Sequence, residues 1–553
     1  MSVSGEGRLA QMFAALVAPT RSLNVPWHRS PSLLSNLAVQ TRDCKSEFTI
    51  DWPTLAVAFA ATIVLSAAAA LMLATARRLG DSHEWDQAIE AVVVAWRNGQ
   101  PLYPAATLGW VYALPYGPAH FLYLDGLDRL GVAFGVSLGD LNLGLAALAP
   151  VAVFVALTWR HADATFELRI AAAALAMFLG FFATGFHVGL QSTPVLWLLL
   201  AIAMAVRIEH DGSWIGPAIV VGAIAGGLAA TKISALFYLV PILVSGLHRI
   251  GAARRWLGPI STGILASAIV VALAFFPDGV SLPDYIATLV AFDRPIDERT
   301  FRRSILYTVP IAIVAATATL DKSSRPMAVA TLAILPPVVW VASLHGSGAW
   351  HLAPLAPIVA SLSISAHAAV ARRVPQAWGM AQIVGAPAIA SFALTGLWFY
   401  DARSQAELTT QGSRMWRGPE AVAARAALAE VLDRHAGANV VLMPGRLGVN
   451  ESPESEASGI ALRTMAAQPA RRGSALYFTL LSWSDHAGGT RLASFIERVI
   501  ATCAADIVVT PIGSRVLRRD TREAVAKHYA RIPGAEPFEV WACRRDVSDR
   551  QPQ

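Results

Sequence analysis

Long apolar runs separated by short polar loops make up most of the chain. The first run, Trp52 to Ala76, contains no charged residue and is long enough to cross a hydrocarbon core of about 30 Å as a helix. Further apolar runs follow at 141–159, 170–187, 191–206, 214–231, 233–247, 257–277, 304–320, 326–344, 351–370 and 376–400. This pattern predicts an α-helical polytopic membrane protein.

One apolar run differs from the others because it carries charge. The stretch 119–136 contains Asp125, Asp128 and Arg129, which are costly on a helix that faces lipid. We therefore predict a re-entrant or interfacial helix here rather than a span.

The basic residues predict how the runs cross the membrane. Only 15% of the residues are charged, against about 25% in soluble proteins. The basic residues recur in every second loop: Arg160 and Arg169, Arg207, Arg249 with Arg254 and Arg255, Lys322 and Arg325, and Arg372 and Arg373. The positive-inside rule places these loops in the cytoplasm. The net charge of +6 therefore reflects topology, and nucleic acid is not an expected partner.

This alternation predicts the number of spans. The loops at 187–191, at Lys232, at 278–303 and at 345–351 would lie outside. The segment 117–159 must then cross the membrane once in net terms, which gives 11 spans. A count of 12 is the alternative, and it leaves several basic loops on the wrong side.

The two ends of the chain are polar. Residues 1–51 are interpreted as a cytoplasmic leader without a cleavable signal peptide, and 52–400 as the transmembrane domain. Residues 401–553 alternate apolar strand-like runs at 439–443, 475–480, 506–510 and 538–542 with helical patterns at 419–435, 490–501 and 520–528. Such alternation predicts a small α/β domain, which lies outside by parity.

The three cysteines leave two interpretations open. Cys44 precedes the first span, whereas Cys503 and Cys543 follow the last, and their spacing is not that of a metal site. In an extracytoplasmic tail the last two could form a disulfide. Two free buried thiols are the other interpretation.

The two largest outside loops, 77–118 and 278–303, carry most of the candidate chemistry. The first places Asp81, Glu84 and Asp86 directly after a span, where carboxylates are costly and more often serve a site than a surface. The alternative is that some of them only cap the following helix, whose dipole favours acids in its first turn. In the second loop, Tyr285 to Phe292 fits a short amphipathic helix on the membrane surface.

The first loop resembles that of a known superfamily. The residues that carry the resemblance are Asp86, then Gly99, Pro101, Leu102 and Tyr103, then Tyr116 and Pro118. This order resembles the first extracytoplasmic loop of GT-C-type glycosyltransferases, which include protein mannosyltransferases, aminoarabinose transferases and mycobacterial polyprenyl-phosphate-mannose-dependent mannosyltransferases. Weaker matches are Gly189 to Gln191, Gly226 to Lys232 and His351 to Pro354. The resemblance covers roughly residues 52–400.

The resemblance implies an activity and roles for these residues. It implies transfer of a sugar from a polyprenyl-phosphate-linked donor to a lipid, glycan or protein acceptor, with inversion, on the outer face of a bacterial cytoplasmic membrane. Asp86 is the first candidate for the base that takes the acceptor proton, followed by Glu84 and Asp81. No cofactor is implied beyond the donor, and the spacing of these acids does not support a metal site.

The leaving phosphate requires cations, and the sugar and prenyl chain require contact surfaces. The phosphate candidates are Lys232, Arg294, Arg299 and His351; the other substrate contacts are Tyr103, Tyr116 and Gln191. Each has a structural alternative. Lys232 could snorkel at a helix end, the arginines could pair with Asp293, Asp297 and Glu298, His351 could be structural, and the tyrosines could belong to an interfacial aromatic belt.

Two other functional classes fit the same spans. A transporter or flippase for a lipid-linked or small polar solute usually shows internal repeats and mid-membrane charges. This chain has no obvious repeat, and its candidate charges lie on one face. A scaffold protein with a degenerate GT-C core is the third class.

Overall fold

The computed structural model describes most of residues 52–544. The described parts are 52–79, 89, 92–94, 96–99, 101–103, 116–136, 138–183, 214–251, 255–291, 296–344, 347–410, 419–435, 438, 440–442, 476–477, 499–511, 519–536 and 538–544. The chain divides into two units, Met1–Asp51 and Trp52–Gln553. The first unit coincides with the predicted leader and lies outside the described residues.

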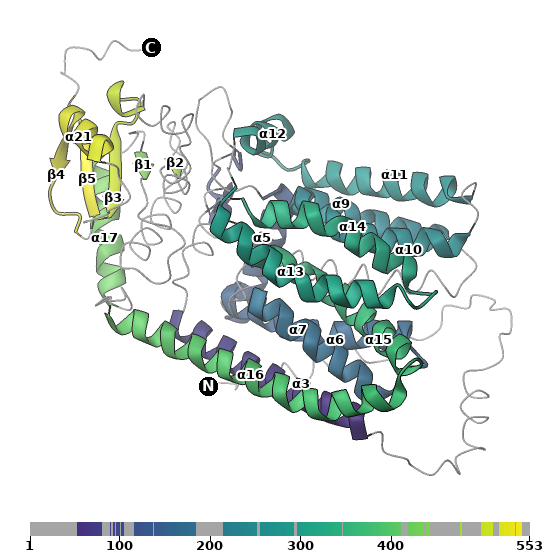
Figure 1. The fold of residues 1–553 in the computed structure, drawn as a ribbon. Coiled ribbons are helices and arrows are strands. Elements are labelled where there is room, and N and C mark those ends of the chain that lie inside the picture. The colour runs from purple at the N-terminus through teal and green to yellow at the C-terminus, as the bar shows by residue number, and fades with distance from the viewer. Residues whose placement is uncertain are drawn as a thin grey trace, which may run out of the picture. The chain divides into compact units, whose positions relative to one another are not determined.

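Helices account for nearly all of the described residues between Trp52 and Thr410 (Figure 1). They are α3 (Trp52–Leu79), α5 (Pro118–Phe134), α6 (Leu138–Arg160), α7 (Phe166–Ala183), α9 (Ile215–Thr231), η4 (Ile233–Leu239), α10 (Val240–Ile250), α11 (Leu257–Ala274), α12 (Leu282–Ala291), α13 (Glu298–Ala318), α14 (Arg325–Ala342), η6 (Ala349–Leu355), α15 (Ala356–Ala371) and α16 (Pro375–Thr410). Each predicted apolar run is therefore mainly helical where it is described; 184–187 and the whole of 191–206 lie outside the described residues.

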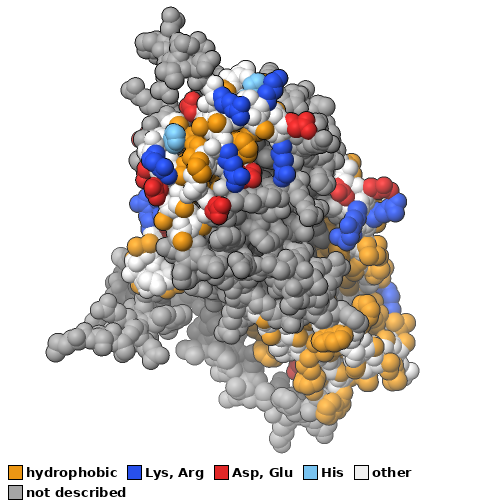
Figure 2. Space-filling model, turned by 90° about the vertical axis from the view of Figure 1, so that its left-hand side faces the viewer, with side chains coloured by type: hydrophobic (Ala, Val, Ile, Leu, Met, Phe, Trp, Pro, Cys, Tyr) orange, Lys and Arg blue, Asp and Glu red, His pale blue; other side chains and the backbone are white. Residues whose placement is uncertain are grey.

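Within the described parts, seven helical segments are long and apolar enough to cross a membrane: Trp52–Leu71, Ile233–Ile250, Leu257–Ala274, Glu298–Ala318, Arg325–Ala342, His351–Ala371 and Pro375–Trp398. The protein is thus a mostly helical, multi-pass membrane protein, and the count of 11 spans stays a prediction. Large apolar side chains on these helices are exposed, among them Leu257 and Phe392. In Figure 2 the hydrophobic side chains at the lower right form a patch with few charges, as a lipid-facing surface requires, whereas charged side chains are mixed among the hydrophobic ones at the upper left.

α5 is the charged helix that the sequence separates from the spans. Pro118 occupies its first turn, where a missing N–H costs nothing, and Gly135 ends it in the left-handed conformation with φ of 68°. Its 17 residues cover about 25 Å, less than a hydrocarbon core. α5 is not one of the seven candidate spans. Whether it is re-entrant or interfacial stays a prediction.

Two of the apolar runs begin with a 3-10 segment instead of a continuous α-helix. Lys232 is extended (φ −161°, ψ 110°) and separates α9 from η4, which continues directly into α10. Likewise η6 continues into α15. Broken helices expose backbone polar groups and occur in membranes only where protein or a cavity surrounds them.

α9 and α11 pack closely through small residues. A side chain on Gly222 would come within 2.2 Å of the Gly263 oxygen, and one on Gly226 within 2.5 Å of the Ser267 oxygen. Glycines four residues apart form a flat stripe that lets two membrane helices approach backbone to backbone.

The described loops of the helical bundle sort into two ends. At one end, the Arg160 guanidinium lies 3.4 Å from Ser245, His161 lies 3.0 Å from Ser361, and Arg372 pairs with Asp321. At the other end, backbone hydrogen bonds join Gly117 to Thr231, Leu102 to Gly279 and Asp297 to Ser343. The described basic loops therefore share one end, as predicted; Arg207 and Arg254 lie outside the described residues. The termini of 117–159 lie at opposite ends, which agrees with one net crossing.

The tail contains the predicted mixture of strands and helices. A five-stranded sheet has the order β2-β1-β3-β5-β4, formed by β1 (Val440–Leu442), β2 (Leu476–Tyr477), β3 (Ile507–Pro511), β4 (Tyr529–Ile532) and β5 (Phe538–Cys543). β1 pairs in parallel with β2 and β3, whereas β5 is antiparallel to β3 and β4. Helices α17 (Pro419–Arg434) and α21 (Arg519–His528) match two predicted helices; of 490–501, only the last three residues are described.

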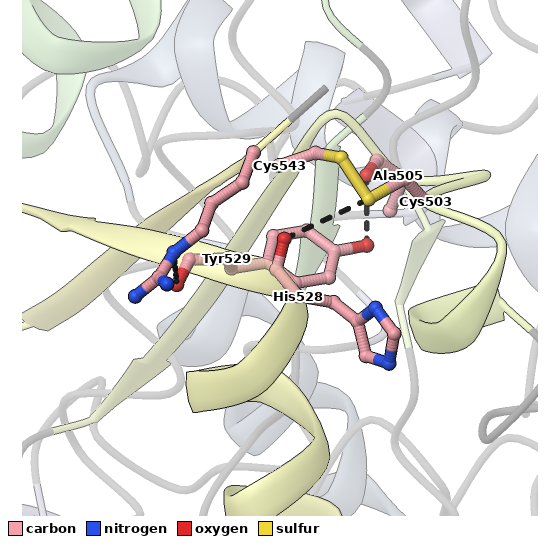
Figure 3. Close-up of a disulfide and its surroundings, with 6 residues drawn as sticks. Cys503, Ala505, His528, Tyr529 and Cys543 are labelled. Carbon is pink, nitrogen blue, oxygen red and sulfur yellow. Dashed lines mark hydrogen bonds between the residues drawn. A yellow bond between two sulfur atoms is a disulfide. The ribbon is translucent and has the colours of Figure 1, made fainter. Parts of the chain in front are cut away.

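A disulfide joins Cys503 to Cys543 within the tail, with Cα atoms 5.8 Å apart (Figure 3). The buried Tyr529 beside it donates a hydrogen bond from its hydroxyl to the Ala505 carbonyl at 2.9 Å. Of the two interpretations of these cysteines, the structure shows the disulfide. Structural disulfides persist in oxidising compartments and are rare in the cytosol.

Candidate functional site

Tyr103 anchors the first outside loop in the protein interior. The loop turns at Gly99, whose φ of 84° favours glycine, and the buried Leu102 donates its N–H to the Gly279 carbonyl at 2.8 Å. The Tyr103 hydroxyl then donates to the Tyr116 carbonyl at 2.8 Å. Burial raises the pKa of Tyr103 well above its ordinary value, so the phenol stays protonated as a donor.

The Tyr116-Gly117-Pro118 turn docks on the end of α9. The Gly117 N–H donates to the Thr231 carbonyl at 2.7 Å. A Cβ at Gly117 would lie 2.0 Å from the Ala230 oxygen, so only glycine permits this approach. Pro118 then starts α5. The turn thereby places the Tyr116 ring next to the helix break at Lys232.

Lys232 and Tyr116 form the centre of the described site. The Lys232 Nζ lies 5.4 Å from the centroid of the Tyr116 ring, within the range of a cation–π interaction. Lys232 is half-buried in the extended residue between α9 and η4. A cation at a break in a membrane helix is costly unless it serves a partner or a ligand. The contact with Tyr116 directs the ammonium toward the first outside loop.

Tyr285 brings the second outside loop into the same cluster. Its ring lies 5.0 Å from that of Tyr103 and 5.7 Å from that of Phe275. Burial raises the pKa of Tyr285 to about 12, and its hydroxyl has no hydrogen-bond partner within the described parts of the chain. The short helix predicted here is present as α12, which begins three residues earlier than the sequence pattern indicates, and its place on the membrane surface stays a prediction.

These contacts bear on the structural alternatives for the tyrosines. Tyr103 is 2% exposed and Tyr116 is 5% exposed. Residues of an interfacial aromatic belt face lipid and water, so that interpretation does not fit these two side chains. The sequence pattern could not distinguish a substrate contact from an aromatic belt, because both interpretations place tyrosines near the end of a span.

His351 lies in a neighbouring part of the bundle, in η6. It is 6% exposed, and its carbonyl accepts a hydrogen bond of 2.5 Å from the Tyr238 hydroxyl of η4. Its backbone N–H donates to the Gly348 carbonyl at 3.1 Å. The two 3-10 segments are therefore tied together through the His351 backbone. A role of its imidazole toward phosphate stays a prediction.

Ion pairs hold the first loop against α5. Arg97 pairs with both Asp125 and Asp128, and Asp125 also pairs with Arg129 at 2.9 Å. Burial lowers the pKa of Arg97, but the hydrogen bonds with the two aspartates outweigh it and raise the pKa. Next to Arg97, the Trp96 Nε1 donates to the Asp278 carbonyl at 3.0 Å. The aspartates that distinguish α5 from the spans thus pair with Arg97, a residue that the sequence pattern did not mark as functional.

The remaining predicted residues are not brought into this cluster by the described contacts. Arg299 is exposed in the first turn of α13. Beside it, Arg302 pairs with Glu298, and the Asp297 carboxylate caps the helix by accepting from the Thr300 N–H at 2.7 Å. Local pairing is thus present on this helix. Asp81, Glu84, Asp86, Gln191 and Arg294 lie outside the described residues.

Comparison with known proteins finds similarity to solved structures only. No protein-family model and no curated protein matches the sequence. The chain is similar to the crystal structure of ArnT from Cupriavidus metallidurans in the apo state, with a TM-score of 0.43 and 15% identity over 82% of this chain and 93% of that chain. The form bound to undecaprenyl phosphate has a TM-score of 0.44 and 15% identity over 91% of this chain and 99% of that chain. Likenesses at this level carry no argument about function.

Proposed function

We propose that the protein is a GT-C-type membrane glycosyltransferase that moves a sugar from a polyprenyl-phosphate-linked donor to a lipid, glycan or protein acceptor. One observation carries the proposal. The motif tyrosines Tyr103 and Tyr116, the surface helix residue Tyr285 and the cation Lys232 form a single contact chain at one end of a membrane bundle. One of the similar ArnT structures contains undecaprenyl phosphate, and this agrees with the proposal.

The contact chain suits a phosphate at a membrane surface. The Lys232 ammonium supplies positive charge where the phosphate leaves, and low surrounding dielectric strengthens that interaction. The aromatic rings beside it offer flat apolar surfaces for a sugar or for the first isoprene units. Arg294, Arg299, Gln191 and His351 are the further substrate contacts in this proposal.

The first loop supplies the base. In the sequence, the acids Asp81, Glu84 and Asp86 follow the end of α3 and precede Ile89. In the reaction, an acceptor hydroxyl oxygen attacks the anomeric carbon while the bond from that carbon to the donor phosphate oxygen breaks. The phosphate leaves with the bonding electron pair, and Asp86 takes the hydroxyl proton. A single displacement of this kind inverts the anomeric centre.

Two independent features support an outer-face site. The basic loops gather at the opposite end of the bundle, which the positive-inside rule places in the cytoplasm. The tail follows α16, which starts beside the first residues of α3 at that basic end, and it contains a disulfide. A disulfide fits an extracytoplasmic tail. The placement in a bacterial cytoplasmic membrane rests on the family resemblance of the sequence and on its Ala- and Arg-rich composition.

The transporter alternative is favoured by one feature. Transporters often bind solute where membrane helices break, and this bundle has breaks at η4 and at η6 that contact each other through Tyr238 and His351. The two functions differ in whether the bond between sugar and phosphate is cleaved.

The test of the proposal uses the full chain in nanodiscs with a panel of polyprenyl-phosphate sugars. Mass spectrometry follows donor consumption by the wild type and by Asp86→Asn, Glu84→Gln and the double variant. Asp163→Asn, an exposed acid at the basic end, is the matched control. We expect one donor to be consumed by the wild type and the control but not by the double variant. Unchanged turnover in a folded double variant would contradict the role of these acids.

A further inference from the structure

A helical stretch of the first outside loop ends in Trp96 and Arg97. The described residues within 89–97 are helical down to Arg97, and we call them the loop helix. Five of them recur at the spacing of one helix face: Ile89, Val92, Val93, Trp96 and Arg97. The first three are at most 5% exposed and share a hydrophobic cluster with Phe121 and Leu124 of α5. Arg97 therefore adds a charge to the end of a face that is otherwise apolar.

The Arg97 guanidinium contacts α5 through three of its nitrogens. Its Nε pairs with a carboxylate oxygen of Asp125, its Nη2 donates to the Asp125 carbonyl at 3.0 Å, and its Nη1 pairs with Asp128. Asp125 and Asp128 are three residues apart and so share one face of α5. Because the guanidinium is planar and rigid, three contacts fix both the distance and the rotation of the loop helix relative to α5.

Stability alone does not account for these charges. The side chain of Asp125 is 11% exposed and that of Arg97 is 27% exposed. Removing charges from water offsets much of their mutual attraction, so an apolar contact of similar volume would hold the two helices about as well. The ion pairs add a defined orientation. Arg129 also pairs with Asp125, at 2.9 Å, but both residues belong to α5, so this pair fixes no second segment.

The neighbouring Trp96 connects the loop helix to the second outside loop. Its Nε1 donates to the Asp278 carbonyl at 3.0 Å, and a Cβ on Gly279 would lie 3.5 Å from the same nitrogen. The Gly279 carbonyl accepts from the Leu102 N–H at 2.8 Å, and the chain then leads into α12. The end of the loop helix is thus the point at which α5 and both outside loops contact one another.

We propose that Arg97 is a positioning residue of the site: its three contacts with α5 fix the loop helix and thereby set where the candidate acids meet the substrates. Asp86 precedes Ile89 by only three positions in the sequence, so little chain is present to absorb a rotation of the loop helix. Arg97 acts through this helix and does not touch the donor. The inference rests on the proposed glycosyl transfer, in which Asp86 takes the acceptor proton.

The experiment compares Arg97→Lys with Arg129→Gln in the full chain in nanodiscs, with the polyprenyl-phosphate sugar that the wild type consumes. Lysine keeps the charge but lacks the planar fork, so it cannot make the three contacts together. We expect kcat of Arg97→Lys to fall about 10- to 100-fold, as for a displacement of about 1 Å at the reacting groups. KM for the donor should be unchanged, because the Tyr116–Lys232 contact is kept. Arg129→Gln, the matched control on the same Asp125, should leave both constants unchanged.

A second measurement does not depend on turnover and separates a change of position from loss of the fold. Hydrogen–deuterium exchange of the amides of 96–103 and 279–291 is compared among the wild type and both variants at a temperature where all three are folded. Arg97→Lys should raise exchange in both segments, since Trp96 transmits the change to the second loop. Arg129→Gln should raise it in neither.

The two measurements together give outcomes that overturn the proposal. Equal kcat and equal exchange in the two variants would do so. Raised exchange with unchanged kcat would also overturn it, because Arg97 would then only stabilise the loop, and a lower kcat without raised exchange would mean that Arg97 acts on the substrate itself. A wild type that consumes no donor would contradict the proposed function instead; the exchange comparison then decides the positioning role, and equal exchange in the two variants overturns it.

Discussion

The Nζ of Lys232 lies 5.4 Å from the centroid of the Tyr116 ring, across a contact between the break after α9 and the first outside loop. Gly117 makes this contact possible, because its N–H donates to the Thr231 carbonyl while a Cβ in its place would lie 2.0 Å from the Ala230 oxygen. The first outside loop and the end of α9, more than 100 residues apart in sequence, are thereby held together by Gly117 and Thr231, which lie next to Tyr116 and Lys232.

The first prediction concerns the charge of Lys232. Lys232→Gln is expected to weaken binding of polyprenyl phosphate about 10- to 100-fold, because a hydrogen bond to a charged group is worth about 1.5–3 kcal/mol. Fluorescence or mass-spectrometric titration in nanodiscs measures the affinity. Lys322→Gln, which removes an exposed lysine at the other end of the bundle, is the control. Equal affinities of the two variants would show that Lys232 only anchors the helix end.

The second prediction concerns the tyrosine pair. Tyr103→Phe leaves the buried Tyr116 carbonyl without its donor and should destabilise the protein by about 1–3 kcal/mol. Tyr285→Phe removes a hydroxyl that has no hydrogen-bond partner within the described residues, so its effect should be much smaller. Thermal unfolding of both variants in the same detergent makes the comparison. A larger loss of thermal stability in Tyr285→Phe than in Tyr103→Phe would contradict this prediction, because the Tyr285 hydroxyl would then contribute more to stability than the Tyr103 hydroxyl.

The third prediction concerns two glycines of α9. Gly222→Ala places a methyl group against the Gly263 backbone, which cannot yield as a side chain could, so we expect marked destabilisation. Gly227→Ala meets no atom within 4 Å and should be neutral or stabilising by up to about 1 kcal/mol, since alanine is the better helix former. Melting temperatures of both variants test this pair. Similar values would contradict the close α9–α11 packing.

The fourth prediction concerns acidic pH. Burial, followed by Arg160 and Arg249, lowers the pKa of His161 to about 4, below the value of about 6.5 in an unfolded chain. The folded state therefore binds fewer protons than the unfolded state between these values. The resulting stabilisation is complete above about pH 6.5 and is lost as the pH falls toward 4.

His161→Gln keeps a hydrogen-bonding side chain and removes this titration. The drop in melting temperature between pH 7 and pH 4.5 should be smaller in His161→Gln than in the wild type. An equal drop in both proteins would place the acid sensitivity elsewhere.

The helices of the bundle could be predicted because uniform apolar runs of this length allow one structure in lipid. The sidedness of the described basic loops followed from charge alone. The break after α9 could be placed at Lys232, but the 3-10 geometry of η4 depends on its packing and left no sequence signal. In the tail, β4 was missed because it follows α21 with no turn residue between them.

The contacts that build the site could not be predicted from the sequence. Arg97 and Asp125 are 28 positions apart, and Tyr103 and Tyr285 lie in different loops, so only the tertiary fold brings each pair together. The disulfide was left open for the same reason, since 40 residues separate its cysteines. The roles of Asp81, Glu84 and Asp86 stay predictions, because these residues lie outside the described parts of the chain.

The most direct test of the proposed function asks whether the bond between sugar and phosphate is broken. Proteoliposomes carrying one polyprenyl-phosphate sugar, with candidate acceptors outside, would be analysed by mass spectrometry for free polyprenyl phosphate and for glycosylated acceptor. We predict that the two products appear in equal amounts and that Lys232→Gln and Asp86→Asn suppress both. Intact donor that moves to the other leaflet with no product formed would contradict the account and identify a flippase instead.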